Sequence, residues 1–254
     1  MDQASLRIAV FSIEIVLAIG LIFWLRGSVR GVPAPWPLIF KVLFYGAICA
    51  LVSAYVTIKY SFNIIELEKT NQSAVLQFGS WMVLANILVG AVVEELAKYV
   101  VGVFVLIDNK NIRRMSDVII YMIIVGLGFA LIEDALYLLE PSVNASYRLL
   151  SFYLHAGTTA IMGYSMGRFR YGLAGYREMF RALLAAISLH GAYNLATQIQ
   201  NRDYSLYLMI AIAALISLQI FILFRKTVRE EFELNQRDVV IKKPTRLLNL
   251  AGKR

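Results

Sequence analysis

The chain has 254 residues, of which 59% are hydrophobic and 17% are charged, with a net charge of +8 and a mean hydropathy of +0.65. An average soluble domain is about half apolar and a quarter charged, so this composition excludes an ordinary soluble domain. The single cysteine, Cys49, excludes an intramolecular disulfide and a cysteine-based metal site. The apolar residues are also concentrated in blocks, which indicates a membrane protein.

Seven apolar blocks are long enough to cross a hydrocarbon core about 30 Å thick, which needs roughly 20 residues in a helix. Their expected limits are 6–25, 38–58, 78–107, 115–139, 149–167, 179–199 and 205–224. The first block is longer than the apolar part of a signal peptide and is expected to stay as a membrane helix. A polar loop is expected at 61–76. Because no stretch alternates regularly enough for a membrane barrel, the sequence predicts an all-α, polytopic bundle of about seven transmembrane helices.

Residues 1–224 are expected to form one membrane domain, with its distinctive motifs in a core at 78–199, and residues 225–254 to form a basic cytoplasmic tail. Cytoplasmic loops of membrane proteins collect Lys and Arg. Most of the 25 Lys and Arg residues lie in the first, third and fifth predicted loops and in the tail. This distribution predicts an outside N-terminus and a cytoplasmic C-terminus in a cell membrane. Topology therefore explains the positive charge, and no nucleic-acid partner is expected.

Ionisable side chains inside the predicted helices are the most informative feature of the chain. Each opposes insertion by about 2.5–3.5 kcal/mol, so that the seven together oppose it by roughly 18–25 kcal/mol before they pair. A purely structural bundle does not need this load. We expect them to converge on one water-filled cavity in the middle-to-outer half of the membrane. They are Glu94, Glu95, Lys98, Glu133, Asp134, His155 and His190.

The spacing of these residues predicts some of their partners. Glu94 and Lys98 are four residues apart and share a helix face, so that an ion pair that only neutralises itself stays open as the alternative to a role in the site. Glu95 points about 100° away and needs another partner. Asn194 follows His190 by one helical turn. For Glu14, in the first predicted helix, a structural hydrogen bond and a role beside the cavity both stay open.

Two chemistries fit the buried cluster. In one, a glutamate acts as general base on a water that attacks a peptide carbonyl, and histidine and asparagine stabilise the oxyanion. In the other, His155, His190 and Glu133 bind Zn²⁺, which acidifies the water. The HExxH spacing of many zinc proteases is absent from the sequence. The sequence alone does not decide between these chemistries.

Four short motifs occur in order between residues 94 and 194, each inside a predicted helix. They are EExxK (Glu94-Glu95-Leu96-Ala97-Lys98), FxxxE (Phe129-Ala130-Leu131-Ile132-Glu133), a motif that consists of one histidine (His155), and HxxxN (His190-Gly191-Ala192-Tyr193-Asn194). This set resembles the motifs of the PrsW family of bacterial and archaeal membrane proteases, which is related to the CAAX prenyl endopeptidases. Lys98 and Glu133 argue against prenyl-protein processing, because the CAAX group has EExxxR and FxxxH at these places.

The resemblance implies that the chain hydrolyses peptide bonds of a membrane-anchored protein, such as a first, extracytoplasmic cut of an anti-sigma factor. Glu94 and Glu95 would activate the water, with a slight preference for Glu95. Glu133, His155 and His190 would position the water or bind Zn²⁺. The complete set of site residues is Glu94, Glu95, Glu133, His155, His190 and Asn194, with Asn194 supporting the oxyanion or orienting His190, and Lys98 tuning Glu94.

Two other functions are compatible with buried acids and histidines. A non-catalytic scaffold of the APH-1 type would keep the cavity but need a partner protease. A proton-coupled transporter would use the same residue types as a proton relay. Inverted repeats would support a transporter, and none is visible in the sequence.

Overall fold

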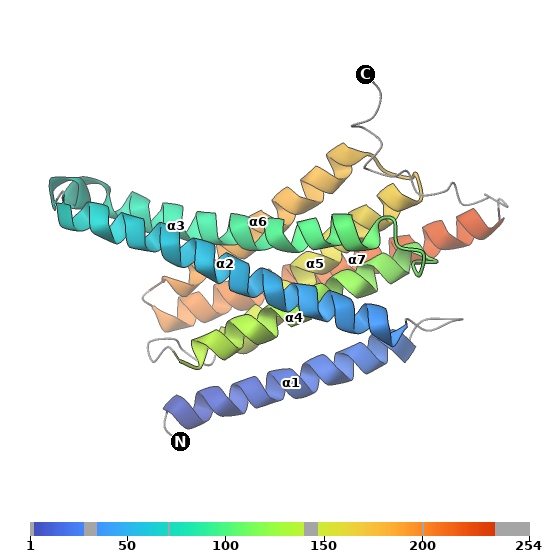
Figure 1. Ribbon diagram of the computed structural model, residues 1–254, viewed down its shortest axis with the longest axis horizontal. Helices are drawn as coiled ribbons and strands as arrows, with labels where there is room; N and C mark the ends of the chain where they lie inside the picture. The colour runs from blue at the N-terminus through green and yellow to red at the C-terminus, as the bar shows by residue number, and fades with distance from the viewer. Residues whose placement is uncertain (1–2, 28–34, 71, 140–146, 200, 237–254) are drawn as a thin grey trace.

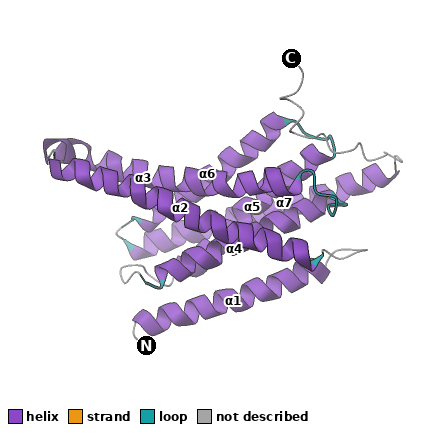
Figure 2. Ribbon diagram, viewed as in Figure 1, coloured by secondary structure: helices purple, strands orange, loops and turns teal. Residues whose placement is uncertain are grey.

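The computed structural model describes residues 3–27, 35–70, 72–139, 147–199 and 201–236 (Figure 1). Within these ranges the chain is almost entirely helical, and none of the residues lies in a strand (Figure 2). The prediction of an all-α membrane bundle is confirmed. The elements are α1 (Gln3–Gly27), α2 (Trp36–Thr70), α3 (Gln72–Val101), the short π-helix η1 (Gly102–Leu106), α4 (Met115–Tyr137), α5 (Arg148–Arg170), α6 (Tyr176–Thr197) and α7 (Arg202–Gln236).

Four of the described helices are long and apolar enough to cross a membrane, judged by length and composition alone. These spans are Ala4–Gly27 of α1, Trp36–Tyr60 of α2, Met115–Tyr137 of α4 and Arg202–Leu234 of α7. The other three helices, α3, α5 and α6, carry the remaining polar residues of the predicted site. The number of seven membrane crossings therefore stays a prediction.

The predicted polar loop at 61–76 is wrong, because α2 continues to Thr70 and α3 begins at Gln72. Residues 61–76 contain no glycine or proline, and their Glu, Lys, Gln and Leu residues favour helix. With 35 residues and a rise of about 1.5 Å per residue, α2 is longer than a hydrocarbon core about 30 Å thick. The α2–α3 hairpin accordingly extends beyond the neighbouring helices (Figure 1).

The last helix also extends beyond its predicted end at residue 224, because α7 continues to Gln236. Its extension is fixed to the bundle by Glu230, which pairs with Arg168 at 3.3 Å, and by Glu231, which accepts a hydrogen bond from the Ser116 backbone N–H at 2.8 Å. The first part of the expected tail at 225–254 is thus helical. Residues 237–254 lie outside the described part of the chain.

Helix α4 occupies the centre of the bundle. It packs most extensively against α5 and α2, and α1 lies along the edge of the bundle beside it (Figure 1). Most of its side chains are buried on every face. A helix that is apolar all round is expected in such a place, because no face needs to meet water.

Glycines bring α2 into backbone contact with α4. A side-chain carbon added at Gly128 would collide with the carbonyl oxygen of Leu43, and one added at Gly46 would collide with the carbonyl oxygen of Val125. The two helices can cross at this distance only because both positions lack a side chain. Small residues allow such close approach between membrane helices.

Glycines also set the distance between α4 and α5. A side-chain carbon at Gly126 would collide with the backbone of His155, and one at Gly163 would lie 2.9 Å from the Cα of Ile119. At Gly167 it would lie 2.9 Å from the carbonyl oxygen of Met115. The absence of side chains at these positions lets the two helices touch, and Gly126 in particular allows His155 to lie against α4.

Arg170, at the end of α5, holds the end of the α3 segment in place. Its guanidinium group donates hydrogen bonds to the carbonyl oxygens of Ile107, of Asn109 at 3.0 Å and of Ile112 at 3.1 Å. These carbonyls follow the end of η1, where few backbone N–H groups remain to donate to them. The contact prevents α3 from sliding along its axis relative to α5. It thereby sets which polar side chains of the two helices lie at the same level.

Gly46→Ala and Gly128→Ala are each expected to lower the free energy of unfolding by about 1–3 kcal/mol, because the added methyl group forces α2 and α4 apart. The matched control is Gly20→Ala, where an added carbon has nothing within 4 Å. That variant is expected to be as stable as the parent or more stable, because alanine favours helix over glycine. Thermal unfolding of the purified proteins in detergent measures the difference. Equal stability of all three variants would contradict the backbone contact.

Candidate active site

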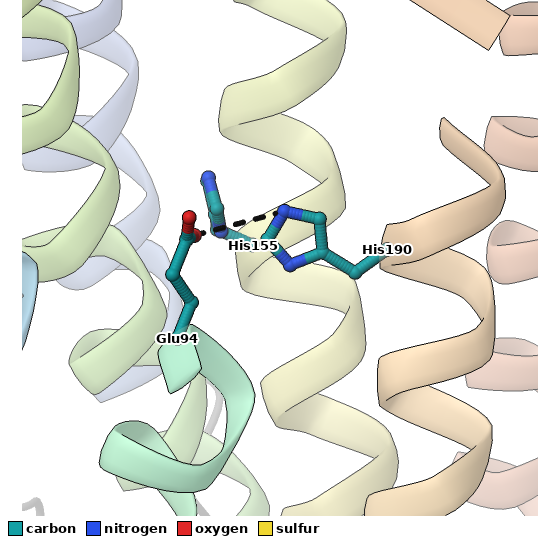
Figure 3. Close-up of side chains that lie close together, drawn as sticks. All are labelled: Glu94, His155 and His190. Atoms are coloured by element: carbon teal, nitrogen blue, oxygen red, sulfur yellow. Dashed lines mark ion pairs between the residues drawn. The ribbon is translucent and has the colours of Figure 1, made fainter. Parts of the chain in front are cut away.

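Ionisable side chains from four helices lie together inside the bundle. Figure 3 shows three of them, Glu94, His155 and His190, turned toward one another from α3, α5 and α6. The tertiary structure thus brings together residues that are up to 96 positions apart in the chain. The full cluster consists of Glu94, Glu95 and Lys98 from α3, Glu133 and Asp134 from α4, Arg148 and His155 from α5, and His190 from α6.

His190 lies between the two adjacent glutamates of α3. Its Nδ1 is 2.7 Å from Oε1 of Glu95, and its Nε2 is 3.6 Å from Oε2 of Glu94. Because a carboxylate only accepts hydrogen bonds, Nδ1 carries the proton and donates it to Glu95. The other ring nitrogen, Nε2, therefore faces Glu94. The ring is 2% exposed, so its orientation depends on these contacts rather than on solvent.

His155 is fully buried and has a different pair of neighbours. Its Nδ1 is 2.8 Å from Nζ of Lys98, and its Nε2 is 2.8 Å from Oε2 of Glu133. An ammonium group only donates, so Nδ1 accepts from Lys98 and Nε2–H donates to Glu133. The two contacts together define a neutral imidazole with its proton on Nε2. Its ring lies 5.1 Å from the ring of His190.

Lys98 has no exposed surface, and each of its described partners comes from the cluster or the core around it. Its ammonium group pairs with Oε1 of Glu95 at 2.7 Å and lies 4.0 Å from the centre of the Phe129 ring. The described ion pair of Lys98 is therefore with Glu95 and not with Glu94, the partner considered from the spacing. Neighbours three residues apart share a helix face as well as those four apart, and His155 draws the ammonium toward Glu95.

The two adjacent glutamates differ in how far their oxygens are engaged. Oε1 of Glu95 contacts both Lys98 and His190, and the side chain is completely buried. The side chain of Glu94 is 14% exposed, and its buried Oε2 accepts no hydrogen bond from any described residue. Oε2 of Glu95 also accepts no described hydrogen bond, but that side chain has no exposed surface, so Glu94 is the more accessible of the two to a water, a substrate or a metal ion.

Arg148 belongs to this network, although sequence reasoning placed it among the loop charges. It begins α5 and donates from Nη2 to Oε2 of Glu133 at 2.7 Å and from Nε to Asp134. Its guanidinium group also lies 4.2 Å from the centre of the Tyr137 ring. Two adjacent buried carboxylates with no basic residue on their own helix were the signal that could have pointed to it.

The remaining predicted residues lie at the margin of the cluster. Asn194 is half-buried, and in the described structure its backbone carbonyl accepts from Thr197 Oγ1 at 2.7 Å. No hydrogen bond of its side chain to the cluster is present among the described contacts. Glu14 is fully buried on α1, beside Asp134.

The arrangement fits a catalytic Zn²⁺ site. Glu94, His155 and His190 each offer one ligand atom, and these atoms lie within 4.8 Å of one another. Two histidines and one glutamate are a common ligand set of catalytic zinc. His190 has the expected second contact, a carboxylate on the ring nitrogen that faces away from the group. His155 uses both ring nitrogens, so a metal would replace one of its contacts. Glu94, rather than the predicted Glu133, joins the two histidines in this group.

The fold and the cluster define a class: a multi-pass helical membrane protein with a buried carboxylate and imidazole site that can activate water. Comparison with known proteins narrows this class. A model of the family described as PrsW family intramembrane metalloprotease matches residues 34–222. The chain therefore belongs to the PrsW family, and this membership assigns it to the membrane-embedded peptidases. No solved structure matches the chain.

Three curated relatives illustrate the similarity. The chain is 25% identical to Protease PrsW of Clostridioides difficile (strain 630) over 207 residues, which cover 78% of this chain and 82% of the relative. It is 33% identical to Protease PrsW of Geobacillus kaustophilus (strain HTA426) over 110 residues, which cover 42% of this chain and 49% of the relative. It is 29% identical to Protease PrsW of Bacillus subtilis (strain 168) over 143 residues, covering 54% and 63% respectively.

Glu95→Gln and Glu94→Gln are expected to differ in stability although the residues are adjacent. Glu95→Gln leaves Lys98 with an uncompensated buried charge and is expected to lower the free energy of unfolding by about 3–5 kcal/mol. Glu94→Gln breaks no described hydrogen bond of Oε2 and is expected to change it by less than about 1 kcal/mol. Unfolding of both variants in the same detergent provides the comparison. A larger loss in Glu94→Gln would show that the pairing described above is incorrect.

Proposed function

We propose that the chain hydrolyses peptide bonds of membrane-anchored proteins with Glu94 as the residue that activates the water. The observation that carries this proposal is the buried Oε2 of Glu94, which accepts no hydrogen bond from the described residues and faces His190 Nε2. A general base needs a free lone pair beside the water that it deprotonates. The sequence favoured Glu95 slightly for this role, but its engagement by Lys98 and His190 favours Glu94 instead.

The reaction then follows from the positions of the paired groups. Glu94 accepts a proton from water as the water oxygen bonds to the peptide carbonyl carbon, and the carbonyl electron pair moves onto the oxygen. The same carboxyl returns the proton to the amide nitrogen as the C–N bond breaks. Asn194 lies one turn beyond His190 and is half-buried, and we assign its amide to the oxyanion.

The other charged residues hold the histidines. Glu95 orients His190 through Nδ1, and Glu133 orients His155 through Nε2. Lys98 joins the two halves, since it contacts both Glu95 and His155. Each imidazole is thus fixed by a carboxylate, as ligands and catalytic histidines commonly are.

A resident Zn²⁺ fits the same residues, with Glu94, His155 and His190 as its ligands. When bound, the ion would polarise the peptide carbonyl and acidify the attacking water. In that case the carboxylates of Glu95 and Glu133 keep their roles in orienting the two histidines.

The proposed substrate is a membrane-anchored protein cut on its extracytoplasmic side, as in the first cut of an anti-sigma factor. His155 and His190 each lie within two turns of a helix end, at the start of α5 and at the end of α6. The basic residues Arg168 and Arg170 lie at the opposite end of α5. Because basic residues favour the cytoplasmic face, this separation supports a site in the outer half of the membrane, with the N-terminus outside and the C-terminus in the cytoplasm.

Replacing both glutamates, by Glu94→Gln with Glu95→Gln, is expected to abolish cleavage because no free carboxylate remains to activate water. New peptide termini in membranes are compared by mass spectrometry between cells with the wild-type chain and cells with the double variant. Termini present only with the wild type would identify substrates and the face that is cut. Asp108→Asn, at an exposed position, is the control and is expected to leave the termini unchanged. Unchanged termini in the double variant, at matched abundance, would favour a non-catalytic scaffold.

Zinc analysis separates the two chemistries. If zinc is the resident metal, purified wild-type protein is expected to hold about one Zn²⁺ per chain, and the double variant His155→Ala with His190→Ala is expected to hold none. Elemental mass spectrometry after dialysis gives the stoichiometry, with Asp108→Asn as the matched control. An active wild-type protein without zinc would instead assign catalysis to the Glu94 carboxylate alone.

A further inference from the structure

Glu14 is a buried acid on α1, which precedes the residues 34–222 that the family model matches. Helix α1 turns one stripe of residues toward α4 and α5, and the stripe is apolar except at Glu14. Glu14 has no exposed surface. The stripe consists of Val10, Glu14, Ala18, Ile22 and Leu25. A carboxyl in such a stripe opposes the packing of α1 unless it has a partner.

The partner of Glu14 is Asp134 of α4. The two carboxyl groups line one pocket, which Arg7, Tyr137 and Arg148 also line. Both oxygens of Glu14 and Oδ2 of Asp134 are buried, and no described group donates a hydrogen bond to them. Two carboxyl groups can bond to each other only when they share a proton. Their closeness therefore points to one bonded pair rather than to two separate charges.

Asp134 in turn contacts Arg148, which connects the pair to the site. The guanidinium group uses Nε for Asp134 and Nη2 for Glu133. Its planar fork fits two acceptors at once and loses this geometry when either acceptor moves. Oε2 of Glu133 lies 2.7 Å from Arg148 and 2.8 Å from Nε2 of His155. The position of Glu133 therefore depends on where Asp134 holds the guanidinium group.

We propose that Glu14 is a positioning residue that, through Asp134 and Arg148, holds Glu133 against His155. The inference rests on the proposed function, since it gives His155 a part in catalysis. It assigns to α1 a role in the chemistry, in addition to its packing at the edge of the bundle (Figure 1). Glu14 touches neither the substrate nor the reacting atoms.

Glu14→Leu is expected to lower kcat by about tenfold to a hundredfold, because a misplacement of about 1 Å in a catalytic group has effects of this size. KM is expected to change by less than about twofold, since no substrate contact is removed. Glu14→Gln keeps a hydrogen-bonding amide beside Asp134 and is expected to retain most of the wild-type kcat. The assay uses purified chain in liposomes and a substrate identified through the peptide termini described above. Wild-type kcat in Glu14→Leu would overturn the proposal.

A packing control separates positioning from the docking of α1. Ile22→Ala removes part of a buried side chain from the same stripe without touching the acidic pair. It is expected to leave kcat within about twofold of the wild type, although it can lower the melting temperature. A loss of kcat equal to that of Glu14→Leu would mean that the packing of α1 alone matters, and the proposal would fall.

The path through Arg148 is tested by a double-mutant cycle. Arg148→Lys removes the fork, so that Glu14→Leu has nothing further to disturb, and the double variant is expected to be about as active as Arg148→Lys alone. Effects that multiply would overturn the proposed path. Glu14→Ala serves in the cycle where Glu14→Leu does not accumulate. Absence of both variants from the membrane would make Glu14 a folding residue and overturn the proposal as well.

Failure of this inference is distinguishable from failure of the proposed function. If Glu14→Leu is fully active while the Glu94→Gln and Glu95→Gln double variant is inactive, the proposed function stands and only the positioning role is lost. If the glutamate double variant still produces the peptide termini, the proposed function itself fails.

Discussion

The ammonium group of Lys98 lies in a part of the bundle that solvent does not reach, where a charge is tolerated only when it is paired and hydrogen bonded. It takes its partners from two helices, Glu95 of α3 at 2.7 Å and His155 of α5 at 2.8 Å, and lies over the Phe129 ring of α4. Because Glu95 also holds His190 of α6, this one cation connects side chains of four helices. The orientation of both histidines depends on it.

Pairing of this kind engages most of the charged side chains of the cluster. Glu95 and Glu133 are each shared between a cation and an imidazole. Glu94 has a buried oxygen to which no described residue donates. Glu95 and Glu14 also have oxygens without a described donor, but neither side chain has any exposed surface, whereas the side chain of Glu94 is 14% exposed. Glu94 is therefore the carboxylate of the three that a water can reach. Buried polar atoms without a hydrogen-bond partner are expected at functional sites.

The network also depends on how closely the helix backbones approach one another. Hydrogen bonds of 2.7–2.8 Å between α4 and α5 require that the helices touch, and Gly126 allows it because a side chain there would collide with the backbone of His155. On the opposite side of α4, Gly46 and Gly128 permit the same approach by α2. The glycines set the distance between the helices, and that distance sets the hydrogen-bond lengths between the charged side chains. A substitution at one of these glycines is therefore expected to disturb the charged network as well.

The sequence by itself determined the all-α membrane class, the helices that carry Glu94, Glu133, His155 and His190, and the family, because hydropathy and motif spacing are local properties of the chain. It placed a loop at 61–76 that is largely helical, because polarity was read as a break where no glycine or proline requires one. Only the tertiary structure decided that Lys98 pairs with Glu95, that Arg148 joins Glu133 and Asp134, and that Glu14 lies beside Asp134. The physical reason is that a buried charge takes its partner from whichever helix lies against it, and helix contacts are set by packing across the bundle rather than by spacing along one helix.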